Sequence, residues 1–485
     1  MIRANCGLTC MLALGAAATS GLPAQTVTAL FSFNREDGQW ASNQMIQATD
    51  GDPYGTTQEG GASGKGTIFR ITPGGAFSEL YDFCSQPNCS DGASPMAGLV
   101  QATNGFLYGT AFEGGFTPSE CLSGCGTVFK ISLSGEFTTV YEFCKTGTCT
   151  DGARPAGGLI QAINGDLYGT TEYGGSQCES CGTVLRMTPG GTLTTLFNFT
   201  AGAGGERPIA SLVQAANGNL YGTTALGGES NTGTIFKITP TGTWTGLASF
   251  CTEGANRCSN GEAPYGAMVQ GPDGNLYGTT MSGGAYGFGE VYQVTPEGAL
   301  SVVYSFCAEV NCTDGELPLA GLVLATDGNL YGTTEYGGVY GFGTLFRVSP
   351  GGAFMSLYSF CPEAGCEQGS NPVAALVQGT NGDLYGTTLE YGGYGQGTIF
   401  SLSAGLSPFV KAQPPAGKVG AAVIILGSDL SGATSVTFNG TTASFTVATA
   451  TEITTAVPAG AHSGAIQVMT PGGALASNVP FFAVP

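Results

Sequence analysis

The chain has 485 residues and a formal net charge of −20, from 34 acidic and 14 basic side chains. This excess of negative charge excludes nucleic acid and anionic membrane surfaces as expected partners, because both repel a polyanion. Glycine is abundant at 82 residues, yet 42% of the residues are hydrophobic. No amphipathic helical pattern of useful length occurs, so the sequence predicts an all-β protein with many turns.

The first 24 residues have the form of a secretory signal. Arg3 precedes a short apolar run from Leu8 to Ala18, and Leu-Pro-Ala ending at Ala24 provides a cleavage site. No later stretch reaches the roughly 18 apolar residues that a membrane span needs. The chain ends in Pro480-Phe-Phe-Ala-Val-Pro485, which is too short for an anchor. We therefore expect a secreted or extracytoplasmic protein with no membrane span.

Sixteen cysteines agree with export. Two lie in the signal segment, and the other fourteen form seven close pairs. A zinc site is the competing interpretation, but only Cys178 and Cys181 have the two-residue spacing of a zinc knuckle, and no histidine lies near them. An even number of paired cysteines in an exported chain indicates disulfides. We predict disulfides, and no metal, between Cys84 and Cys89, Cys121 and Cys125, Cys144 and Cys149, Cys178 and Cys181, Cys251 and Cys258, Cys307 and Cys312, and Cys361 and Cys366.

A stretch of the form Leu-Tyr-Gly-Thr-Thr recurs seven times along the chain. Its tyrosines, 53 to 60 residues apart, are Tyr54, Tyr108, Tyr168, Tyr221, Tyr277, Tyr331 and Tyr385. A fixed period of this length indicates a repeat architecture. In the unit from residue 98, strand A (98–102) leads through Asn104-Gly105 to strand B (107–110), and an Asn-Gly step between apolar runs is a strong hairpin signal. Strand C (126–131) and a fourth strand, D, complete the unit.

Four short strands per repeat, in up-and-down order, predict a seven-bladed β-propeller, with a solenoid as the alternative. The chain ends decide between the two. Residues 28–33 match strand D at 194–199, and they come before any strand A. The seventh unit stops after its strand C at residues 397–402. The N-terminal strand should therefore complete the last blade and close the ring, which removes an open sheet edge.

The repeat pattern stops near Leu406. Residues 408–485 alternate apolar and polar positions between turns such as Asn439-Gly440, which predicts a β-sandwich. We therefore divide the chain into a signal peptide (1–24), a propeller (26–404) and a sandwich (408–485).

The repeats carry a long shared pattern that includes Leu-Val-Gln-Ala, Asn/Asp-Gly-Asn/Asp-Leu-Tyr-Gly-Thr-Thr and Gly-Thr-Val-Phe-Lys-Ile. This pattern resembles the GloVer tandem repeat of exported bacterial proteins with varied C-terminal anchors. The resemblance implies an extracytoplasmic, propeller-like protein and no known reaction. The C-terminal segment, with residues 427–430, 432–440, 457–460 and 470–473, looks like an IPT/TIG domain, which implies an immunoglobulin-like fold.

Histidine chemistry is excluded on the propeller, because the single histidine, His462, lies in the C-terminal segment. No Ser-His-Asp, Cys-His or histidine-metal site is therefore possible there. The glycine-rich loops lack the Gly-Lys-Ser/Thr of a phosphate-binding loop, and we expect no cofactor. Carboxylates remain as possible acids and bases, and five glutamates recur just before the Gly-Gly step, but similar residues on separate blades are not the paired carboxylates of a glycosidase.

Blade geometry divides the loops between two faces of the ring. The A–B and C–D turns share one face and are short. The B–C and D–A loops share the other face, and they contain the cysteine pairs, the glutamates and the loop aromatics, among them Phe288, Tyr340 and Tyr394. Because loops on a rigid scaffold carry function, we predict ligand contacts on this long-loop face by Glu59, Glu113, Phe116, Glu172, Tyr173, Tyr286, Glu335, Tyr336, Glu390 and Tyr391.

The expected function is that of a non-catalytic secreted binding or surface-interaction protein, with an extracellular glycan or a surface protein as partner. Two alternatives stay open. One is an exported carbohydrate-active enzyme, a lyase or glycosidase, that uses the loop carboxylates. The other is a structural protein of the envelope or matrix. The sequence does not identify the ligand or the oligomeric state.

Overall fold

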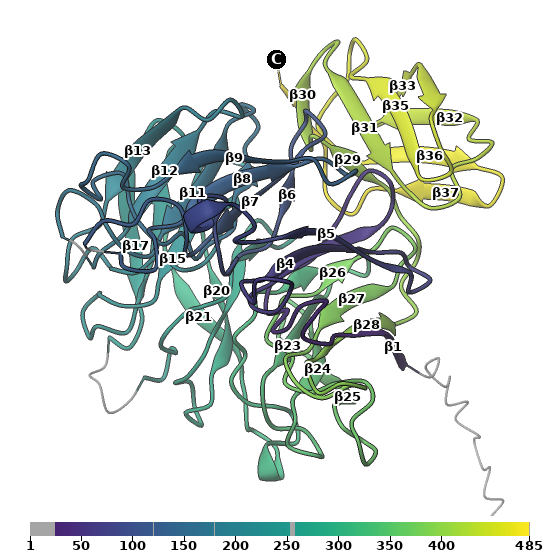
Figure 1. Cartoon of the computed structure of the whole chain (residues 1–485). Coiled ribbons are helices and arrows are strands. Elements are labelled where there is room, and N and C mark those ends of the chain that lie inside the picture. The colour runs from purple at the N-terminus through teal and green to yellow at the C-terminus, as the bar shows by residue number, and fades with distance from the viewer. Residues whose placement is uncertain (1–24, 120, 179, 253–257, 485) are drawn as a thin grey trace, which may run out of the picture.

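The computed structural model describes residues 25–119, 121–178, 180–252 and 258–484. The expected signal segment, residues 1–24, lies outside these residues. Figure 1 shows a ring of four-stranded sheets and a second β-domain attached to it. Within the described residues the helical elements are two single 3₁₀ turns, η1 (Pro87–Cys89) and η2 (Val310–Cys312). None of the described helices is long and apolar enough to span a bilayer.

Six of the seven propeller sheets consist of consecutive antiparallel strands. Blades 1 to 3 are β2 (Ile46–Gln47), β3 (Pro53–Thr57), β4 (Thr67–Ile71) and β5 (Phe77–Asp82); β6 (Val100–Gln101), β7 (Leu107–Ala111), β8 (Thr127–Ile131) and β9 (Phe137–Glu142); and β10 (Ile160–Gln161), β11 (Leu167–Thr171), β12 (Thr183–Met187) and β13 (Leu193–Asn198). Blades 4 to 6 are β14 (Val213–Gln214), β15 (Leu220–Thr224), β16 (Thr234–Ile238) and β17 (Trp244–Ser249); β18 (Val269–Gln270), β19 (Leu276–Thr280), β20 (Glu290–Val294) and β21 (Leu300–Ser305); and β22 (Val323–Leu324), β23 (Leu330–Thr334), β24 (Thr344–Val348) and β25 (Phe354–Ser359).

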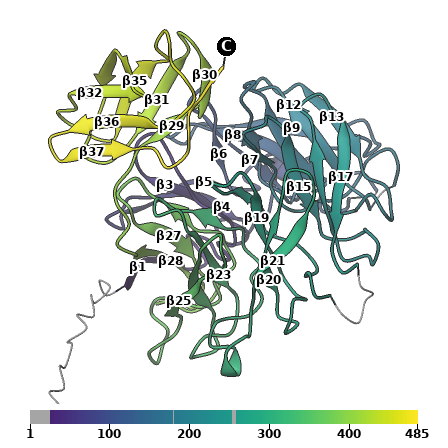
Figure 2. The ribbon, with the colours of Figure 1, turned by 180° about the vertical axis from the view of Figure 1, so that it is seen from behind.

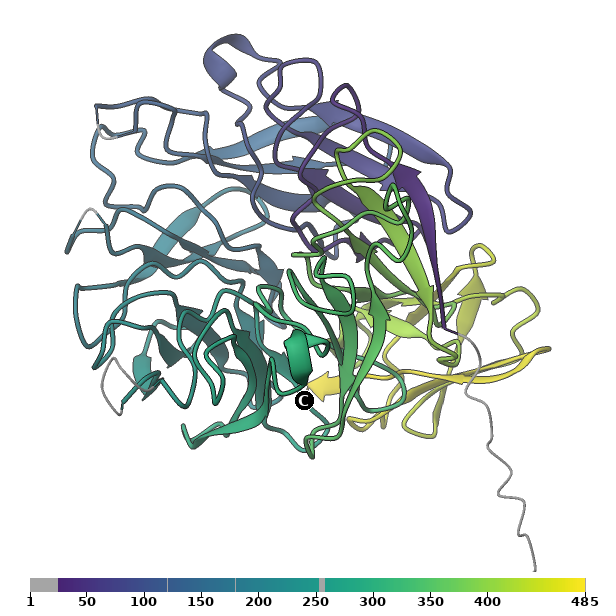
Figure 3. The same ribbon diagram turned by 90° about the horizontal axis from the view of Figure 1, so that it is seen from below.

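The seventh sheet confirms the predicted closure of the ring. Its order is β26 (Val377–Gln378), β27 (Leu384–Thr387), β28 (Thr398–Ser403) and β1 (Thr26–Ser32), so the N-terminal strand occupies the outer position. Thr26 pairs with Ser403 and Ser32 with Thr398. In Figure 3 this purple strand lies beside the green strands of the last blade. Phe33 follows directly, is fully buried and packs edge-on against Phe69 of blade 1 at 5.4 Å.

The repeated Tyr-Gly-Thr-Thr stretch is strand B, and its residues build the scaffold. All seven tyrosines are buried. Each hydroxyl is hydrogen-bonded to the Asp or Asn that opens the preceding A–B turn; Tyr54 donates to Asp50 at 2.6 Å, for example, and Tyr108 accepts from Asn104 at 2.9 Å. The glycine is required by packing, since a Cβ on Gly55 would lie 2.5 Å from the Phe69 ring. These contacts tie the hairpin turn to the blade core.

A glutamine on the inner strand connects most blades to the preceding one. Gln101 accepts a hydrogen bond from the backbone N–H of Thr49 at 2.9 Å. Equivalent bonds join Gln161 to Thr103, Gln214 to Ile163, Gln270 to Ala216, Gln378 to Thr326 and, across the closure, Gln47 to Thr380. Blade 6 has Leu324 instead, and the residue that would donate to it is Pro272, which has no N–H. The donor and the acceptor are therefore absent together.

The C-terminal domain is the predicted sandwich. One sheet has the order β29 (Lys411–Gln413), β31 (Ala422–Leu426), β35 (Glu452–Ala456) and β34 (Phe445–Val447); the other has β33 (Thr441–Ala443), β32 (Ser435–Phe438), β36 (Ile466–Thr470) and β37 (Gly473–Ala476); and β30 (Ala416–Lys418) pairs in parallel with β38 (Phe482–Val484). Its separate apolar core includes Val423, Ile425, Phe438 and Ile453, all essentially inaccessible to solvent. His462 lies in the loop before β36.

Candidate functional site

The sandwich domain rests on the A–B turn face of the propeller, where Figure 2 shows it from behind. The Phe409 N–H donates to the carbonyl of Thr380 at 3.0 Å, and Lys411 Nζ donates to the carbonyl of Gln378 at 2.7 Å. Thr451 Oγ1 donates to the carbonyl of Asp50 at 3.3 Å. These contacts involve blades 7 and 1, so the C-terminal domain occupies part of the turn face and leaves the long-loop face uncovered.

A central channel of about 530 Å³ runs between the inner strands of the blades. Small residues such as Gly98, Gly157 and Gly266 line it, and Pro415, Val479 and Phe482 of the sandwich contribute to its wall. None of the described residues that line the channel carries a charge. The described part of the channel wall therefore supplies no carboxylate for acid–base chemistry. The cysteine pairs, the glutamates and the loop aromatics lie on the long-loop face instead.

The long-loop face is built from disulfide-closed loops, and all seven predicted disulfides are present. Two of them close the B–C loops of blades 2 and 3, where Cys121 is bonded to Cys125 and Cys178 to Cys181. The other five close D–A loops: Cys84 is bonded to Cys89, Cys144 to Cys149, Cys251 to Cys258, Cys307 to Cys312 and Cys361 to Cys366. The prediction of disulfides at these fourteen cysteines is therefore confirmed.

The second cysteine of each D–A pair also connects its loop to the following blade. The carbonyl of Cys258 accepts from the Gly284 N–H at 2.7 Å, and that of Cys366 accepts from the Gly392 N–H at 3.1 Å. The same bond joins Cys89 to Gly115, Cys149 to Gly175 and Cys312 to Gly338. The repeated Gly-Gly step therefore docks five of the B–C loops onto a disulfide-closed D–A loop, whereas in blades 1 and 4 the equivalent acceptors are Arg35 and Gly202.

An aspartate anchors several of the D–A loops from within. Asp151 accepts from the Cys144 N–H and from the Tyr141 hydroxyl, the latter at 2.8 Å. Asp314 accepts in the same way from the Tyr304 hydroxyl at 2.7 Å. The repeated Asp-Gly step after the cysteine pair is thus a loop anchor rather than a ligand contact.

The predicted site residues do not form one ring of equivalent positions. Isolated bridges to the D–A loops place Glu59, Glu113, Tyr173, Tyr336 and Glu390 at the same position of their blades. Glu172 and Glu335 come one residue earlier. Tyr391 comes one residue later, at the position of Gly337, and has a left-handed φ of 59°. The five glutamates therefore occupy two different positions in their blades: Glu59, Glu113 and Glu390 share one, and Glu172 and Glu335 share the other. An alignment of the blades on the Gly-Gly step alone shifts the seventh blade by one residue.

Three of these glutamates already have partners within the protein. Glu59 accepts from Gln39 Nε2 at 2.7 Å, and Glu113 lies 3.4 Å from Lys65 Nζ. Glu172 lies 3.9 Å from a guanidinium nitrogen of Arg207. Burial raises the pKa of Glu172, and the Tyr173 hydroxyl and the charges of Arg207 and Arg154 oppose that rise. These three carboxylates therefore interact with other residues of the protein.

Tyr173 lies between two cations. The guanidinium carbons of Arg154 and Arg207 stand 5.6 Å and 5.1 Å from the centre of its ring. Attraction between the cations and the ring face holds the tyrosine in place. Phe116, in the same region of blade 2, is partly exposed, and its carbonyl accepts from the Cys125 N–H at 3.1 Å.

Glu335 of blade 6 and Glu390 of blade 7 are close enough for their charges to interact. Burial raises the pKa of Glu335, the Tyr336 hydroxyl opposes that rise, and the negative charge of Glu390 adds to it. The Glu335 charge is in turn the largest cause of the raised pKa of Tyr336. Tyr391 packs edge-on against Phe342 with ring centres 5.6 Å apart. The predicted residues of these two blades thus form one acidic and aromatic cluster.

Three further tyrosines occupy one equivalent position on three adjacent blades. Tyr286, Tyr340 and Tyr394 lie at the tips of the B–C loops of blades 5, 6 and 7, with 54%, 46% and 67% of each residue exposed. The loops share their geometry, because the bridges Gly283–Phe288, Gly337–Phe342 and Tyr391–Gln396 and the tip hydrogen bonds repeat. We call these three residues the tyrosine arc.

The same loop position differs on blades 1 and 4. Ser63 and Ser230 stand there, and their hydroxyls donate to the carbonyls of Cys84 and Cys251. The tyrosine arc is therefore confined to one side of the ring. Tyr286 is one of the ligand contacts predicted from the sequence, whereas Tyr340 and Tyr394 are predicted only as aromatic residues of the long-loop face. The signal that identifies them is the shared Gly-x-Tyr-Gly-x-Gly of residues 284–289, 338–343 and 392–397.

The fold and its domains define the class of protein: an all-β repeat protein with a closed propeller and an immunoglobulin-like C-terminal domain. The family model of the Gloeobacter/Verrucomicrobia repeat matches residues 15–149, 88–260 and 252–444, and that of the IPT/TIG domain matches residues 409–483. The chain therefore belongs to the Gloeobacter/Verrucomicrobia repeat family and carries a TIG domain, as the sequence pattern predicts. A search of curated proteins found no match.

Solved structures resemble this chain at low identity. A fungal alcohol oxidase of the AA5 family, solved in complex with copper, is 14% identical, with a TM-score of 0.50 over 95% of this chain and 98% of its own. The extracellular domain of a hybrid two-component system from B. thetaiotaomicron is 11% identical, with a TM-score of 0.47 over 92% of this chain and 57% of its own. A protein described as a gluconolactonase is 12% identical, with a TM-score of 0.38 over 79% of this chain and 94% of its own. At these identities the likeness concerns the fold alone.

Proposed function

We propose that the protein is an exported, non-catalytic binding protein that recognises a neutral glycan through the long-loop face. The tyrosine arc is the observation that carries this proposal, because it presents three exposed aromatic side chains at equivalent positions of adjacent blades. Seven disulfides are typical of an exported chain. The signal peptide remains part of the proposal, and N-terminal sequencing of the exported protein tests the cleavage after Ala24.

The chemistry of the face favours a sugar polymer over other ligands. A tyrosine ring offers a rigid apolar surface with a polar end, at a low cost in side-chain entropy. That combination suits a sugar ring, which has an apolar face and a rim of hydroxyl groups. Glu335 and Glu390, which lie in the same B–C loops as Tyr340 and Tyr394, can supply acceptors for those hydroxyls. The net charge of −20 disfavours acidic polysaccharides, so a neutral glycan is the expected class.

Three tyrosines on neighbouring blades also suit a repeating ligand. Each contact to one sugar unit is weak, but a polymer that reaches two or three of them gains from the high effective concentration of the second and third contacts. We expect short oligosaccharides to bind much more weakly than long chains of the same sugar.

The test is a glycan array probed with the wild-type protein and with a Tyr286→Ala/Tyr340→Ala/Tyr394→Ala variant. Wild-type binding to a neutral glycan and its loss in the triple variant are expected. A Ser63→Ala/Ser230→Ala variant is the matched control, because it changes the same loop position on the two blades outside the arc, and it should bind like the wild type. Unchanged binding by the triple variant would refute the proposal.

The Glu335–Glu390 pair favours one alternative, a carbohydrate-active enzyme. A carboxyl group with a raised pKa that interacts with a second carboxylate is one feature of glycoside hydrolase sites, which also need a set separation between the two groups. Incubation with a panel of polysaccharides separates the two functions: release of reducing ends or unsaturated products, abolished by Glu335→Gln, would assign catalysis. Neither binding nor turnover on any glycan would favour a structural role.

A further inference from the structure

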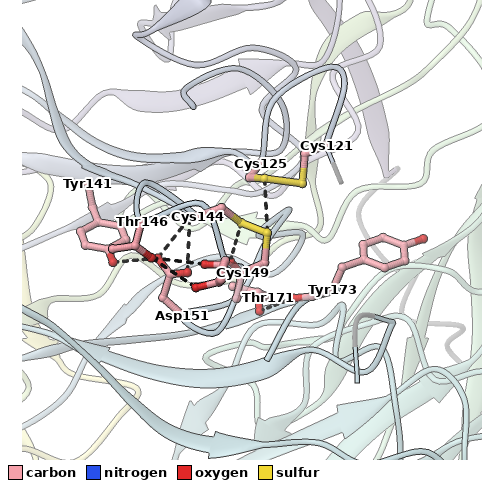
Figure 4. Close-up of a disulfide and its surroundings, with 11 residues drawn as sticks. Cys121, Cys125, Tyr141, Cys144, Thr146, Cys149, Asp151, Thr171 and Tyr173 are labelled. Atoms are coloured by element: carbon pink, nitrogen blue, oxygen red, sulfur yellow. Dashed lines mark hydrogen bonds between the residues drawn. A yellow bond between two sulfur atoms is a disulfide. The ribbon is translucent and has the colours of Figure 1, made fainter. Parts of the chain in front are cut away.

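Two of the seven disulfides lie against each other at the edge of blade 2. Cys121–Cys125 closes its B–C loop, and Cys144–Cys149 closes the D–A loop that leads to blade 3. Figure 4 shows the two bonds side by side, with Cys125 Sγ 3.7 Å from Cys149 Sγ. All four sulfur atoms lie within 4.8 Å of one another, and no other group of three or more cysteine, histidine or acidic side chains in the described chain comes as close.

The spacing of the four sulfurs matches a metal centre. In a tetrahedral tetrathiolate zinc site with Zn–S bonds of about 2.3 Å, neighbouring sulfurs are about 3.8 Å apart. The non-bonded Cys125–Cys149 separation already has this value. Cys121, Cys125 and Cys144 are buried, and Cys149 is partly buried, so the centre would be shielded from bulk water as structural zinc sites are.

The positions of the four cysteines do not depend on the sulfur–sulfur bonds alone. The Arg154 N–H donates to the Cys125 carbonyl at 2.7 Å, and the Gly175 N–H donates to the Cys149 carbonyl at 2.7 Å. The Cys144 N–H donates a hydrogen bond to the Asp151 carboxylate at 3.2 Å. Hydrogen bonds from the D–A loop and from the B–C loop of blade 3 thus hold both cysteine loops, and none of these bonds involves a sulfur atom.

We propose that these four cysteines form a tetrathiolate site for Zn²⁺ when both disulfides are reduced. Each disulfide takes two electrons from an external thiol or phosphine reductant and becomes two thiols. A thiol reductant also supplies the two protons and becomes a disulfide, whereas with a phosphine the protons come from water, whose oxygen ends in the phosphine oxide. Binding of one Zn²⁺ then releases four protons, because the ligands are thiolates. Two equivalents of an external disulfide oxidant then accept the four electrons, take up four protons from water and become thiols, while the ion is expelled and the two disulfides of the protein are restored. The site is thus a redox-dependent alternative to the disulfides of the exported protein.

The residues around the four cysteines leave a path to the sulfur atoms and place a positive charge near them. A cavity of about 450 Å³ is lined by Cys121, Cys149, Arg154 and Tyr173, so a reductant and an ion can reach the sulfurs from the long-loop face. A tetrathiolate zinc centre carries a net charge of −2. Arg154 offers a nearby positive charge, and its buried Nε has no hydrogen-bond partner in the described part of the chain. None of these features belongs to the tyrosine arc, so the site is independent of glycan binding.

The test uses the full-length protein reduced with a phosphine under anaerobic conditions. Co²⁺ is the probe, because a tetrahedral cobalt thiolate has an intense charge-transfer absorption. We expect one Co²⁺ per chain, displaced by one Zn²⁺, and a higher melting temperature for the reduced protein when Zn²⁺ is present. The oxidised protein should bind neither ion.

Two variants test whether the cobalt absorption comes from these four cysteines. Cys121→Ser/Cys125→Ser removes half of the ligands and should abolish the absorption and the stabilisation by Zn²⁺. Cys307→Ser/Cys312→Ser removes a D–A pair that has no B–C partner, and it should bind Co²⁺ like the wild type. Absence of tetrahedral cobalt in the reduced wild type, or an equal signal in the Cys121→Ser/Cys125→Ser variant, would overturn the proposal.

Discussion

Glu290 is a buried carboxylic acid at a position where most other blades have threonine. It opens β20 of blade 5, is completely inaccessible to solvent, and neither of its oxygens has a hydrogen-bond partner among the described residues. In five blades the equivalent threonine pairs with the threonine that ends the strand-B motif, as Thr334 and Thr344 do at 2.8 Å. In blade 5 the facing residue is Thr280. We predict that Glu290→Thr stabilises the protein at neutral pH.

The magnitude follows from the shift in pKa. Burial raises the pKa of Glu290 from its ordinary value of 4.5 to about 9. Between these two values the folded protein holds a proton that the unfolded chain has released, so stability falls as the pH rises. The slope is about 1.4 kcal/mol per pH unit, which amounts to about 3 kcal/mol between pH 4.5 and pH 7. A loss of about 1 kcal/mol of packing leaves a net gain of about 2 kcal/mol for threonine at pH 7.

The assay is urea unfolding of the wild type, Glu290→Thr and Glu290→Gln at pH 5, 7 and 8, with the disulfides intact. Glutamine keeps the size of the side chain and removes the titration, so its stability relative to the wild type should rise steadily with pH. All other titrating groups cancel in this difference. A difference between Glu290→Gln and wild type that stays constant from pH 5 to pH 8 would refute the reasoning.

Two predictions concern the ring itself, and both are measured by urea unfolding or calorimetry. Phe33→Ala should destabilise the propeller by about 3–5 kcal/mol, because it removes a buried ring from the closure between blades 7 and 1; deletion of residues 26–33 should cost more, since it exposes the edge of β28. Normal stability after the deletion contradicts a closed ring. Gln378→Leu should lower the free energy of unfolding by about 1–3 kcal/mol, because the Thr326 N–H loses its hydrogen-bond acceptor. Leu324→Gln is its control and should give no gain, since Pro272 has no N–H to donate; equal effects of the two variants would contradict the bridging role of the glutamines.

The scaffold was predictable because every blade repeats its chemistry. The period of the tyrosines predicts seven blades, and the unpaired strand at residues 28–33 predicts the closure that β1 and β28 make. The Asn-Gly and Asp-Gly steps mark hairpins whose turn side chains bind the tyrosine hydroxyls. Local spacing alone determines these features.

The site was less predictable because it depends on register and on contacts between blades. The Gly-Gly step aligns six blades, but Tyr391 takes the place of the first glycine in the seventh, and only the bridge between Ser370 and Glu390 reveals it. Sequence spacing pairs Cys121 with Cys125 and Cys144 with Cys149, but it does not show that the two pairs meet. The docking of the TIG domain beside the channel likewise depends on packing between distant segments.

The central claim is that the tyrosine arc binds a neutral glycan, and affinity electrophoresis through gels that contain a neutral polysaccharide tests it most directly. The account predicts that the polysaccharide retards the wild type and the Ser63→Ala/Ser230→Ala control, whereas the Tyr286→Ala/Tyr340→Ala/Tyr394→Ala variant migrates as it does without polysaccharide. Equal retardation of the wild type and the triple variant, or no retardation of the wild type by any polysaccharide of a broad neutral panel, would contradict it.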